Sequence, residues 1–261
     1  MSAQTELIRQ CAALLYDAER SRAPIPPLTR EHPELTADDA YAIQLVNVGR
    51  LCSGGAVVTG KKIGLTSPGM QQLLGVGEPD YGHLFSYMDC DCDVASDALI
   101  QPKIEAEIAF VLGEDLPPRD VTAGDILSAT AYVCAAFEIV DSRVANWKIR
   151  LADTIADNAS SGRYVLGSHH VPPAGLELAS VTMTTERAGD GIVSEGIGSA
   201  VMGDPAVSVA WLANCLRRYG VPLKRGEIVL SGAFAAALPA TKGDVYTAAF
   251  STLGTVTARF I

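Results

Sequence analysis

The chain has 261 residues, of which 48% are hydrophobic and 19% are charged, proportions that are typical of a well-packed globular protein with one or two domains. Its formal net charge of −10 disfavours nucleic acids and anionic membrane surfaces as partners, because both are bound by clustered Lys and Arg. A small anionic substrate is compatible with this charge only where a metal ion or a few cations reverse the local field.

The sequence predicts a protein of the cytoplasm that does not enter a membrane. Its longest weakly polar stretch, residues 126–140, contains Ser128, Thr130 and Glu138 and is too short and too polar to span a bilayer. The first ten residues lack a basic start followed by an apolar core, so no signal peptide is expected. The six cysteines form no CxxC pair and are expected to be reduced thiols.

The N-terminal third is predicted to be mainly helical. Residues 4–20 carry apolar side chains at helical spacing, and three closely spaced prolines then interrupt the helical pattern. A second helix is expected to begin after Thr36, an N-cap residue with Asp39 three positions later. Residues 57–67 predict a strand that leads into a loop, and residues 67–82 predict a short helix followed by a turn rich in Gly and Pro.

From about residue 98 the pattern changes to strands with interspersed helices. Helices are expected over residues 122–132 and 204–219. The predicted strands cover residues 104–112, 133–141, 163–167, 180–187, 227–231, 245–250 and 254–260. This order indicates an α+β protein, with a helical N-terminal part over residues 1–90 and a β-rich catalytic domain over residues 91–261.

Two of the predicted strands carry carboxylates in apolar surroundings. Alternation within QPKIEAEIAF places Lys103, Glu105 and Glu107 on one face, which a half-buried strand with a solvated face would also explain. Glu138 favours another interpretation, because its neighbours in VCAAFEIVDSR are apolar and a buried carboxylate needs a partner. Arg143 could supply that partner. Three glutamates on two neighbouring strands fit better as a shared site for a hard cation, Mg²⁺ or Mn²⁺.

Three further stretches are richer in polar groups than a scaffold needs. The strand in GKKIGLTS ends with Lys61 and Lys62, one of which alternation turns inward as a cation or a proton carrier. Asp80 in EPDYG is either a turn residue or an acid/base group carried on a loop. The polar cluster in DTIADNASSGRYVLG includes Asn158 and Ser160 and is either a capped loop or part of a site.

Four motifs in one order resemble those of the 2-keto-4-pentenoate hydratases and the related 4-oxalocrotonate decarboxylases. The motifs are KKIGLTSPGMQQLLGVGEPDYG, QPKIEAEIAFVL, FEIVDSRVANWKI and DTIADNASSGRYVLG. The resemblance runs from about residue 18 to the C-terminus. It implies the fold of the fumarylacetoacetate hydrolases, a mixed β-roll with the N-terminal helices packed against it, and enzymes of this kind act in meta-cleavage degradation of aromatic and steroid rings.

The resemblance also implies roles for single residues. The family holds its metal with a Glu-x-Glu pair and a downstream Glu, and the matching ligands are Glu105, Glu107 and Glu138. Lys62 and Asp80 match a lysine and an acidic residue of the family, and we expect them to move protons. Asn158 and Ser160 match its Asn-Ala-Ser segment, so we expect them to bind the substrate.

The activity that the resemblance implies is that of a metal-dependent hydratase, a hydro-lyase that adds water to a 2-hydroxy-2,4-dienoate to give a 4-hydroxy-2-oxoacid. The segment NWKIRLADTIADNAS is more similar to the hydratases. Decarboxylation of 4-oxalocrotonate is the alternative, and a non-catalytic metal- or solute-binding protein on the same fold is the second alternative. The family further implies a homo-oligomer, and a complex with a neighbouring pathway enzyme is also expected.

Overall fold

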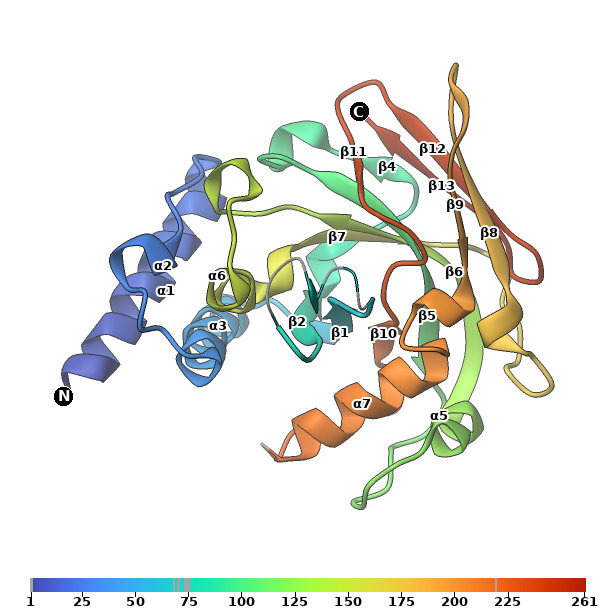
Figure 1. Cartoon of the computed structure of the whole chain (residues 1–261), viewed down its shortest axis with the longest axis horizontal. Coiled ribbons are helices and arrows are strands. Elements are labelled where there is room, and N and C mark those ends of the chain that lie inside the picture. The colour runs from blue at the N-terminus through green and yellow to red at the C-terminus, as the bar shows by residue number, and fades with distance from the viewer. Residues whose placement is uncertain (1, 68, 70, 73–75, 219) are drawn as a thin grey trace.

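The structure is a computed structural model that describes residues 2–67, 69, 71–72, 76–218 and 220–261 (Figure 1). The helix and turn predicted over residues 67–82 therefore lie partly outside the described residues. Within the described part of the chain, no helix combines the length and the apolar character that a membrane crossing requires.

The N-terminal helices pack together with one later helix and form a layer beside the sheets (Figure 1). These helices are α1 (Ala3–Ser21), α2 (Leu28–Glu31), α3 (Ala37–Ser53) and α6 (Leu151–Ala156). Thr36 caps α3 through a reciprocal capping box with Asp39, as the sequence predicted. Their buried side chains, which include Leu15, Ile43 and Ile155, form a small core of their own.

The larger sheet joins strands from distant parts of the chain. Its order is β2 (Asp80–Phe85), β1 (Val58–Gly64), β10 (Ile228–Leu230), β5 (Lys103–Leu112), β6 (Thr130–Val140), β7 (Ser161–Leu166) and β3 (Asp89–Cys90), with β11 (Leu238–Pro239) paired to β5. Strand β1 is parallel to β10, whereas β10, β5, β6 and β7 are successively antiparallel. The sheet is therefore mixed.

The smaller sheet packs against one face of the larger one. Its order is β4 (Asp93–Val94), β13 (Gly254–Phe260), β12 (Val245–Phe250), β8 (Thr182–Arg187) and β9 (Gly191–Ile197). The main hydrophobic core contains side chains of both sheets, such as Phe110, Phe137 and Phe260, and of two helices, α5 (Ala123–Ala129) and α7 (Pro205–Arg218). The opposite face of β5 and β6 does not contribute to this core and is available to polar side chains.

The α+β class and the mixed β-roll are confirmed, and β12 and β13 have the predicted bounds. The predicted helix over residues 122–132 is wrong at its end, because α5 ends at Ala129 and the next residues pair with β5, Leu112 opposite Thr130. The prediction also missed α6 and the strands β2, β3, β4, β9 and β11. The turn predicted up to residue 82 is wrong at its end, because Asp80, which was expected in a turn or loop, begins β2. Strands β1 and β2 precede residue 90 yet pair within the larger sheet. The division into a helical part over residues 1–90 and a catalytic domain over residues 91–261 stays a prediction.

Candidate metal and catalytic site

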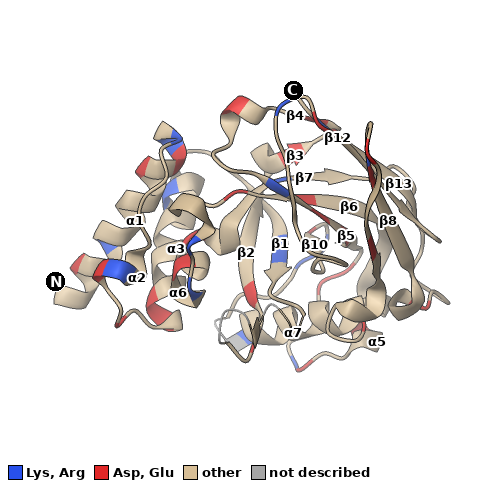
Figure 2. Ribbon diagram, turned by 45° about the horizontal axis from the view of Figure 1, so that its top comes forward, with Lys and Arg blue, Asp and Glu red and all other residues tan. Residues whose placement is uncertain are grey.

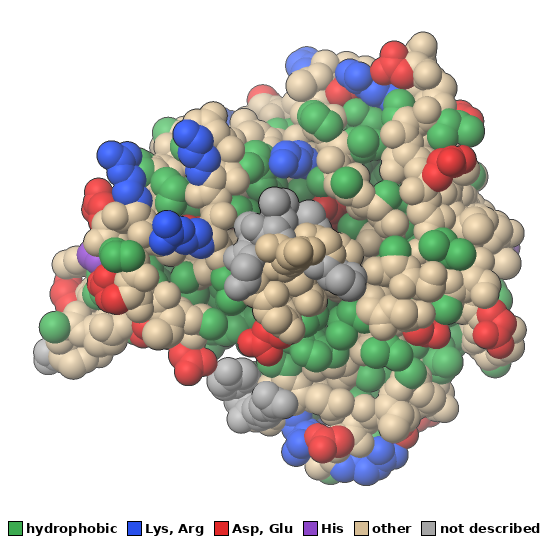
Figure 3. Space-filling view, viewed as in Figure 1, with side chains coloured by type: hydrophobic (Ala, Val, Ile, Leu, Met, Phe, Trp, Pro, Cys, Tyr) green, Lys and Arg blue, Asp and Glu red, His purple; other side chains and the backbone are tan. Residues whose placement is uncertain are grey.

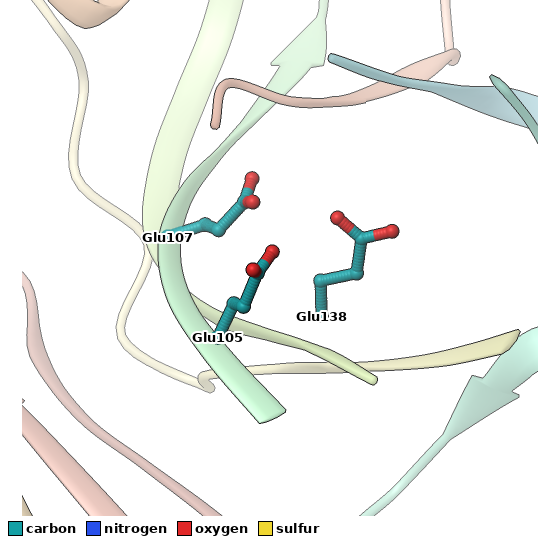
Figure 4. Close-up of side chains that lie close together, drawn as sticks. All are labelled: Glu105, Glu107 and Glu138. Atoms are coloured by element: carbon teal, nitrogen blue, oxygen red, sulfur yellow. The ribbon is translucent and has the colours of Figure 1, made fainter. Parts of the chain in front are cut away.

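Three glutamates converge on the face of β5 and β6 that lies away from the smaller sheet. The antiparallel register places Glu105 directly opposite Glu138, with Glu107 two residues further along β5. One carboxylate oxygen of each residue lies within 4.8 Å of the others. Figure 2 shows acidic residues where β5 and β6 run side by side, and Figure 4 shows the three side chains pointing toward one another. The predicted shared position of these carboxylates is confirmed.

The cluster is short of hydrogen-bond donors. Glu107 Oε2 accepts a hydrogen bond from Gly232 N at 2.8 Å, but Glu107 Oε1 and Glu138 Oε2 are buried without a hydrogen-bond partner among the described residues. Burial and the neighbouring carboxylates raise the pKa of Glu107 well above its ordinary value, and burial raises the pKa of Glu138 to about 7. Buried carboxylates that repel one another are stabilised by a shared hard cation. The residues therefore fit a divalent metal ion.

Lys62 is the cation of the cluster. Its Nζ lies 3.1 Å from Glu138 Oε1 and donates to Ala159 O at 2.9 Å. Burial opposes the charge on Lys62, but the surrounding carboxylates, Glu138 first among them, outweigh this effect and raise its pKa. Lys61 pairs instead with Glu227, at 3.1 Å. Alternation thus turned only Lys62 toward the glutamate cluster, but Lys61 is buried as well, so the prediction that one of the two lysines lies inward is wrong for Lys61.

The contact between Lys62 and Glu138 depends on the shape of the sheet. Strands β1 and β6 are separated by β10 and β5, which in a flat sheet would place them about 14 Å apart. Their side chains meet because the sheet curls toward the glutamate face (Figure 1). The glutamates therefore lie on a concave surface.

Asp80 begins β2 and lies beside Lys62. Its Oδ2 accepts a hydrogen bond from Thr154 Oγ1 at 3.3 Å, whereas its Oδ1 is buried with no hydrogen-bond partner among the described residues. Burial raises the pKa of Asp80, although Lys62 acts in the opposite direction. A Cβ at Gly64 would lie 2.3 Å from Asp80 Oδ1 and 3.4 Å from Lys62 Nζ. Glycine therefore provides the space that the acid and the amine share.

The segment from Asn158 to Ser160 has an uncommon backbone. These three consecutive non-glycine residues have φ values of 55°, 49° and 54°, a conformation that costs about 1–3 kcal/mol per residue. The turn directs Ala159 O to Lys62 and leaves Ser160 Oγ buried with no hydrogen-bond partner in the described structure. Asn158 uses its amide on β2, since Oδ1 accepts from His83 N at 2.7 Å and Nδ2 donates to His83 O at 2.9 Å. A substrate contact by either residue stays a prediction.

Arg143 is not the partner of Glu138. Its Nε lies 2.5 Å from Asp157 Oδ1, and its Nη1 donates to Asp141 O and Ser161 O. This buried guanidinium therefore holds together the loop that follows β6, and the sequence-based alternative that paired it with Glu138 is wrong.

Sequence reasoning missed three groups that position the site. Gly64 could have been recognised, because a glycine inside a strand often marks a close approach. Thr154 and the backbone amide of Gly232 gave no such signal, since they reach Asp80 and Glu107 only through the packing of α6 and of the segment after β10.

Known proteins are similar to this chain in both sequence and fold. The fumarylacetoacetate (FAA) hydrolase C-terminal family model matches residues 94–261. A 2-hydroxyhexa-2,4-dienoate hydratase of Comamonas testosteroni is 46% identical over 250 residues, which cover 94% of each chain. A 2-keto-4-pentenoate hydratase of Paraburkholderia xenovorans is 47% identical over 254 residues, which cover 96% of this chain and 94% of the relative.

Solved structures extend the likeness. The 4-oxalocrotonate decarboxylase from Pseudomonas putida G7, complexed with magnesium and adipate, has a TM-score of 0.94 and 35% identity, over 100% of this chain and 99% of that one. The fumarylpyruvate hydrolase from Pseudomonas aeruginosa, in complex with Mn²⁺ and pyruvate, shares only the fold, with a TM-score of 0.61, 12% identity and coverage of 77% and 88%. Because the family model covers more than half of the chain and the hydratases align with nearly all of it, the chain belongs to the fumarylacetoacetate hydrolase family, alongside the 2-keto-4-pentenoate hydratases.

Proposed function

We propose that the protein is a metal-dependent hydratase of the 2-keto-4-pentenoate type. It adds water to a 2-hydroxy-2,4-dienoate and yields a 4-hydroxy-2-oxoacid, in the meta-cleavage catabolism of aromatic or steroid rings. The observation that carries the proposal is the buried cluster of three glutamates with Lys62 and Asp80 beside it, in a chain that is 46–47% identical to hydratases over nearly its whole length.

The residues that would hold the metal are Glu105, Glu107 and Glu138. Mg²⁺ or Mn²⁺ is the proposed ion, since all three ligands are hard oxygen donors and the similar decarboxylase binds magnesium. When bound, the ion supplies Lewis-acid stabilisation for negative charge that develops on the substrate oxygen atoms.

Two proton movements are required from the protein. The dienol must lose its hydroxyl proton and gain a proton at C5, which leaves a C3–C4 double bond conjugated to the ketone. Water then adds at C4 while C3 gains a proton, so that the sum is one molecule of water added. Asp80, whose pKa is raised by burial, and the Lys62 ammonium are the proton carriers that we assign to these steps.

We assign substrate binding to the strained turn from Asn158 to Ser160. Ser160 Oγ is a buried hydroxyl with no hydrogen-bond partner among the described residues, so it is free to bond to a substrate oxygen. Asn158 supports substrate binding by holding the turn in place, because its amide is hydrogen-bonded to the backbone of His83. A cytoplasmic location, a homo-oligomeric state and a complex with a neighbouring pathway enzyme are further parts of the proposal. The location rests on the cysteines, which are expected to be reduced thiols, and the other two rest on the family resemblance.

Decarboxylation of 4-oxalocrotonate is the second candidate, because the decarboxylase from Pseudomonas putida G7 has a TM-score of 0.94 with this chain. Its 35% identity is lower than the 46–47% of the hydratases, so hydration is preferred.

One experiment separates the candidates. The purified protein is incubated with Mg²⁺ or Mn²⁺ and 2-hydroxypenta-2,4-dienoate, and separately with 4-oxalocrotonate, and the products are followed by NMR and by CO₂ release. A hydratase yields 4-hydroxy-2-oxopentanoate from the first compound. Rapid CO₂ release from the second without hydration of the first would establish the decarboxylase instead, and metal binding without either reaction would establish the non-catalytic alternative.

A further inference from the structure

The glutamate face of β5 opens toward Lys103. Lys103, Glu105 and Glu107 follow one another on this face. The side chains of Lys103 and Glu105 are half-buried, whereas that of Glu107 is 0% exposed. A small molecule that reaches the carboxylates along β5 therefore passes the Lys103 ammonium first.

The Lys103 ammonium rests on an aromatic ring. Its Nζ lies 4.3 Å from the centroid of the Trp147 ring, and no carboxylate of the described residues forms an ion pair with it. Hydrogen bonds fix the position of the ring. Trp147 Nε1 donates to Gln101 O at 3.0 Å, and Gln101 Oε1 accepts from Asn146 N at 3.0 Å. Asn146 and Trp147 adopt φ values of 58° and 55°. A strained, hydrogen-bonded turn thus presents the ring to the lysine.

This arrangement leaves the charge of Lys103 available. An ammonium over an aromatic face is attracted by the ring but not neutralised by it, whereas an ion pair with Glu105 would consume both charges. Lys103 still acts on that carboxylate at longer range: burial raises the pKa of Glu105, and Lys62 and Lys103 oppose the rise. The lysine is therefore close to the cluster without being part of it.

Three other buried cations already have carboxylate partners. Arg143 is paired with Asp157, Lys61 with Glu227 and Lys62 with Glu138. The chain has a net charge of −10. On the face seen in Figure 3, basic side chains lie over the N-terminal helices and at the upper and lower edges, and acidic ones are spread between them. An anionic substrate therefore needs a local cation on its path to the three carboxylates.

We propose that Lys103, supported by the Trp147 ring, is a carboxylate-binding subsite at the entrance to the glutamate cluster. Its ligand class is small 2-oxo- or 2-hydroxycarboxylates, and the identification of that class rests on the proposed function. Lys103 binds the carboxylate as the substrate approaches, so it contributes to capture and not to the chemical step.

The kinetic test compares Lys103→Met with Lys148→Met, a matched loss of an exposed lysine next to Trp147. With 2-hydroxypenta-2,4-dienoate, Lys103→Met is expected to raise KM roughly tenfold while kcat stays within about twofold, and to weaken the salt dependence of kcat/KM. Lys103→Arg is expected to restore most of the KM. Lys148→Met should behave like the unmodified protein.

Binding can be measured without turnover. The chain has two tryptophans, so a Trp211→Phe background leaves Trp147 as the reporter, and its fluorescence is titrated with 2-oxopentanoate, which contains no double bond to hydrate. The apparent Kd should rise by the same factor in Lys103→Met as KM does. Mn²⁺ affinity and thermal unfolding are measured alongside. If Lys103→Met does not fold, Lys103→Gln replaces it.

The outcomes distinguish this inference from the proposed function. If the unmodified protein hydrates the dienoate but Lys103→Met matches Lys148→Met in KM, salt dependence and Kd, the subsite is refuted and the hydratase stands. If no dienoate is hydrated but the Trp147 signal responds to 2-oxopentanoate in a manner that depends on Lys103, the subsite stands and the hydratase proposal fails.

Discussion

Lys62 and Glu138 meet across a curled sheet, with Nζ and Oε1 3.1 Å apart although two strands separate their own strands. The contact sets the charge of the site. Three ionised glutamates and one ammonium leave a formal charge of −2, which a single divalent ion would cancel. Such a balance matters in a buried site, because uncompensated charge there is costly.

Replacement of Glu107 by Gln tests the metal site at nearly constant side-chain volume. We expect Mn²⁺ affinity to fall by more than about tenfold and hydratase activity to be lost, because one ligand charge is removed. The metal-free variant should be no less stable than the metal-free parent, since a repulsive buried carboxylate is gone. Calorimetric Mn²⁺ titration and urea unfolding provide the measurements. Full activity after complete chelation would show that the glutamates are not metal ligands.

The stability of the metal-free protein should depend on pH through the same cluster. Burial raises the pKa of Glu138 from 4.5 to about 7, so its folded state binds a proton more tightly than the unfolded chain does. The resulting stability is complete below about pH 4.5 and is lost as the pH rises through about 7. Between these limits the free energy of unfolding should fall by a few kcal/mol.

Bound Mg²⁺ should remove most of this dependence, because the ion keeps the carboxylates ionised at both pH values. Urea unfolding at about pH 5 and about pH 8, with and without Mg²⁺, measures the effect. Glu138→Gln serves as the control and should flatten the metal-free profile. An equally steep profile in that variant would assign the titration to another group.

Asp80→Asn tests the proton carrier. The amide keeps the size of the side chain and can still accept a hydrogen bond from Thr154, but it cannot exchange a proton as a carboxyl group does. We expect kcat to fall by about 10²–10⁴-fold, with Mn²⁺ affinity and 2-oxopentanoate binding retained. Asp115→Asn, at an exposed ion pair with Lys224, is the matched control and should leave kcat unchanged. A kcat within twofold of the parent would remove Asp80 from the mechanism.

Gly64→Ala disturbs the site without removing any functional group. The new Cβ would lie 2.3 Å from Asp80 Oδ1, so Asp80 must move away from Lys62, and we expect a loss of kcat at least as large as tenfold. Gly49→Ala is the matched control, because nothing lies within 4 Å of a Cβ there. That substitution in the interior of α3 should stabilise the protein by about 1 kcal/mol. Equal kcat values for both variants would contradict the close packing of Asp80 and Lys62.

Sequence patterns within single strands predicted the part of the site that depends on the geometry of one strand. Alternation along β5 fixed the common face of Glu105 and Glu107, and the apolar run around Glu138 indicated that this carboxylate is buried. These features needed only that β5 and β6 be neighbours. Period-2 patterns likewise predicted β12 and β13.

The remaining features depend on long-range packing that no local pattern contains. Lys62 reaches Glu138 because the sheet curls, and Thr154 reaches Asp80 because α6 packs beside β2. Arg143 was a reasonable partner for Glu138 because it is near in sequence. It forms its ion pair with Asp157 instead. The Trp147 ring lies under Lys103 because of a turn whose left-handed residues are not glycines, so no local pattern indicated a turn there.

The parallel pairing of β1 with β10 has a consequence for biosynthesis. Gly60 pairs with Ile228 so closely that a Cβ on Gly60 would lie 1.9 Å from the Ile228 carbonyl oxygen. The strand that carries Lys62 is translated well before its second neighbour, β10. Until β10 is made, the nascent chain leaves that edge of β1 unpaired, and an unpaired strand edge is prone to aggregation. Translation that stops before β10 should yield a polypeptide without a competent site, however well its N-terminal helices fold.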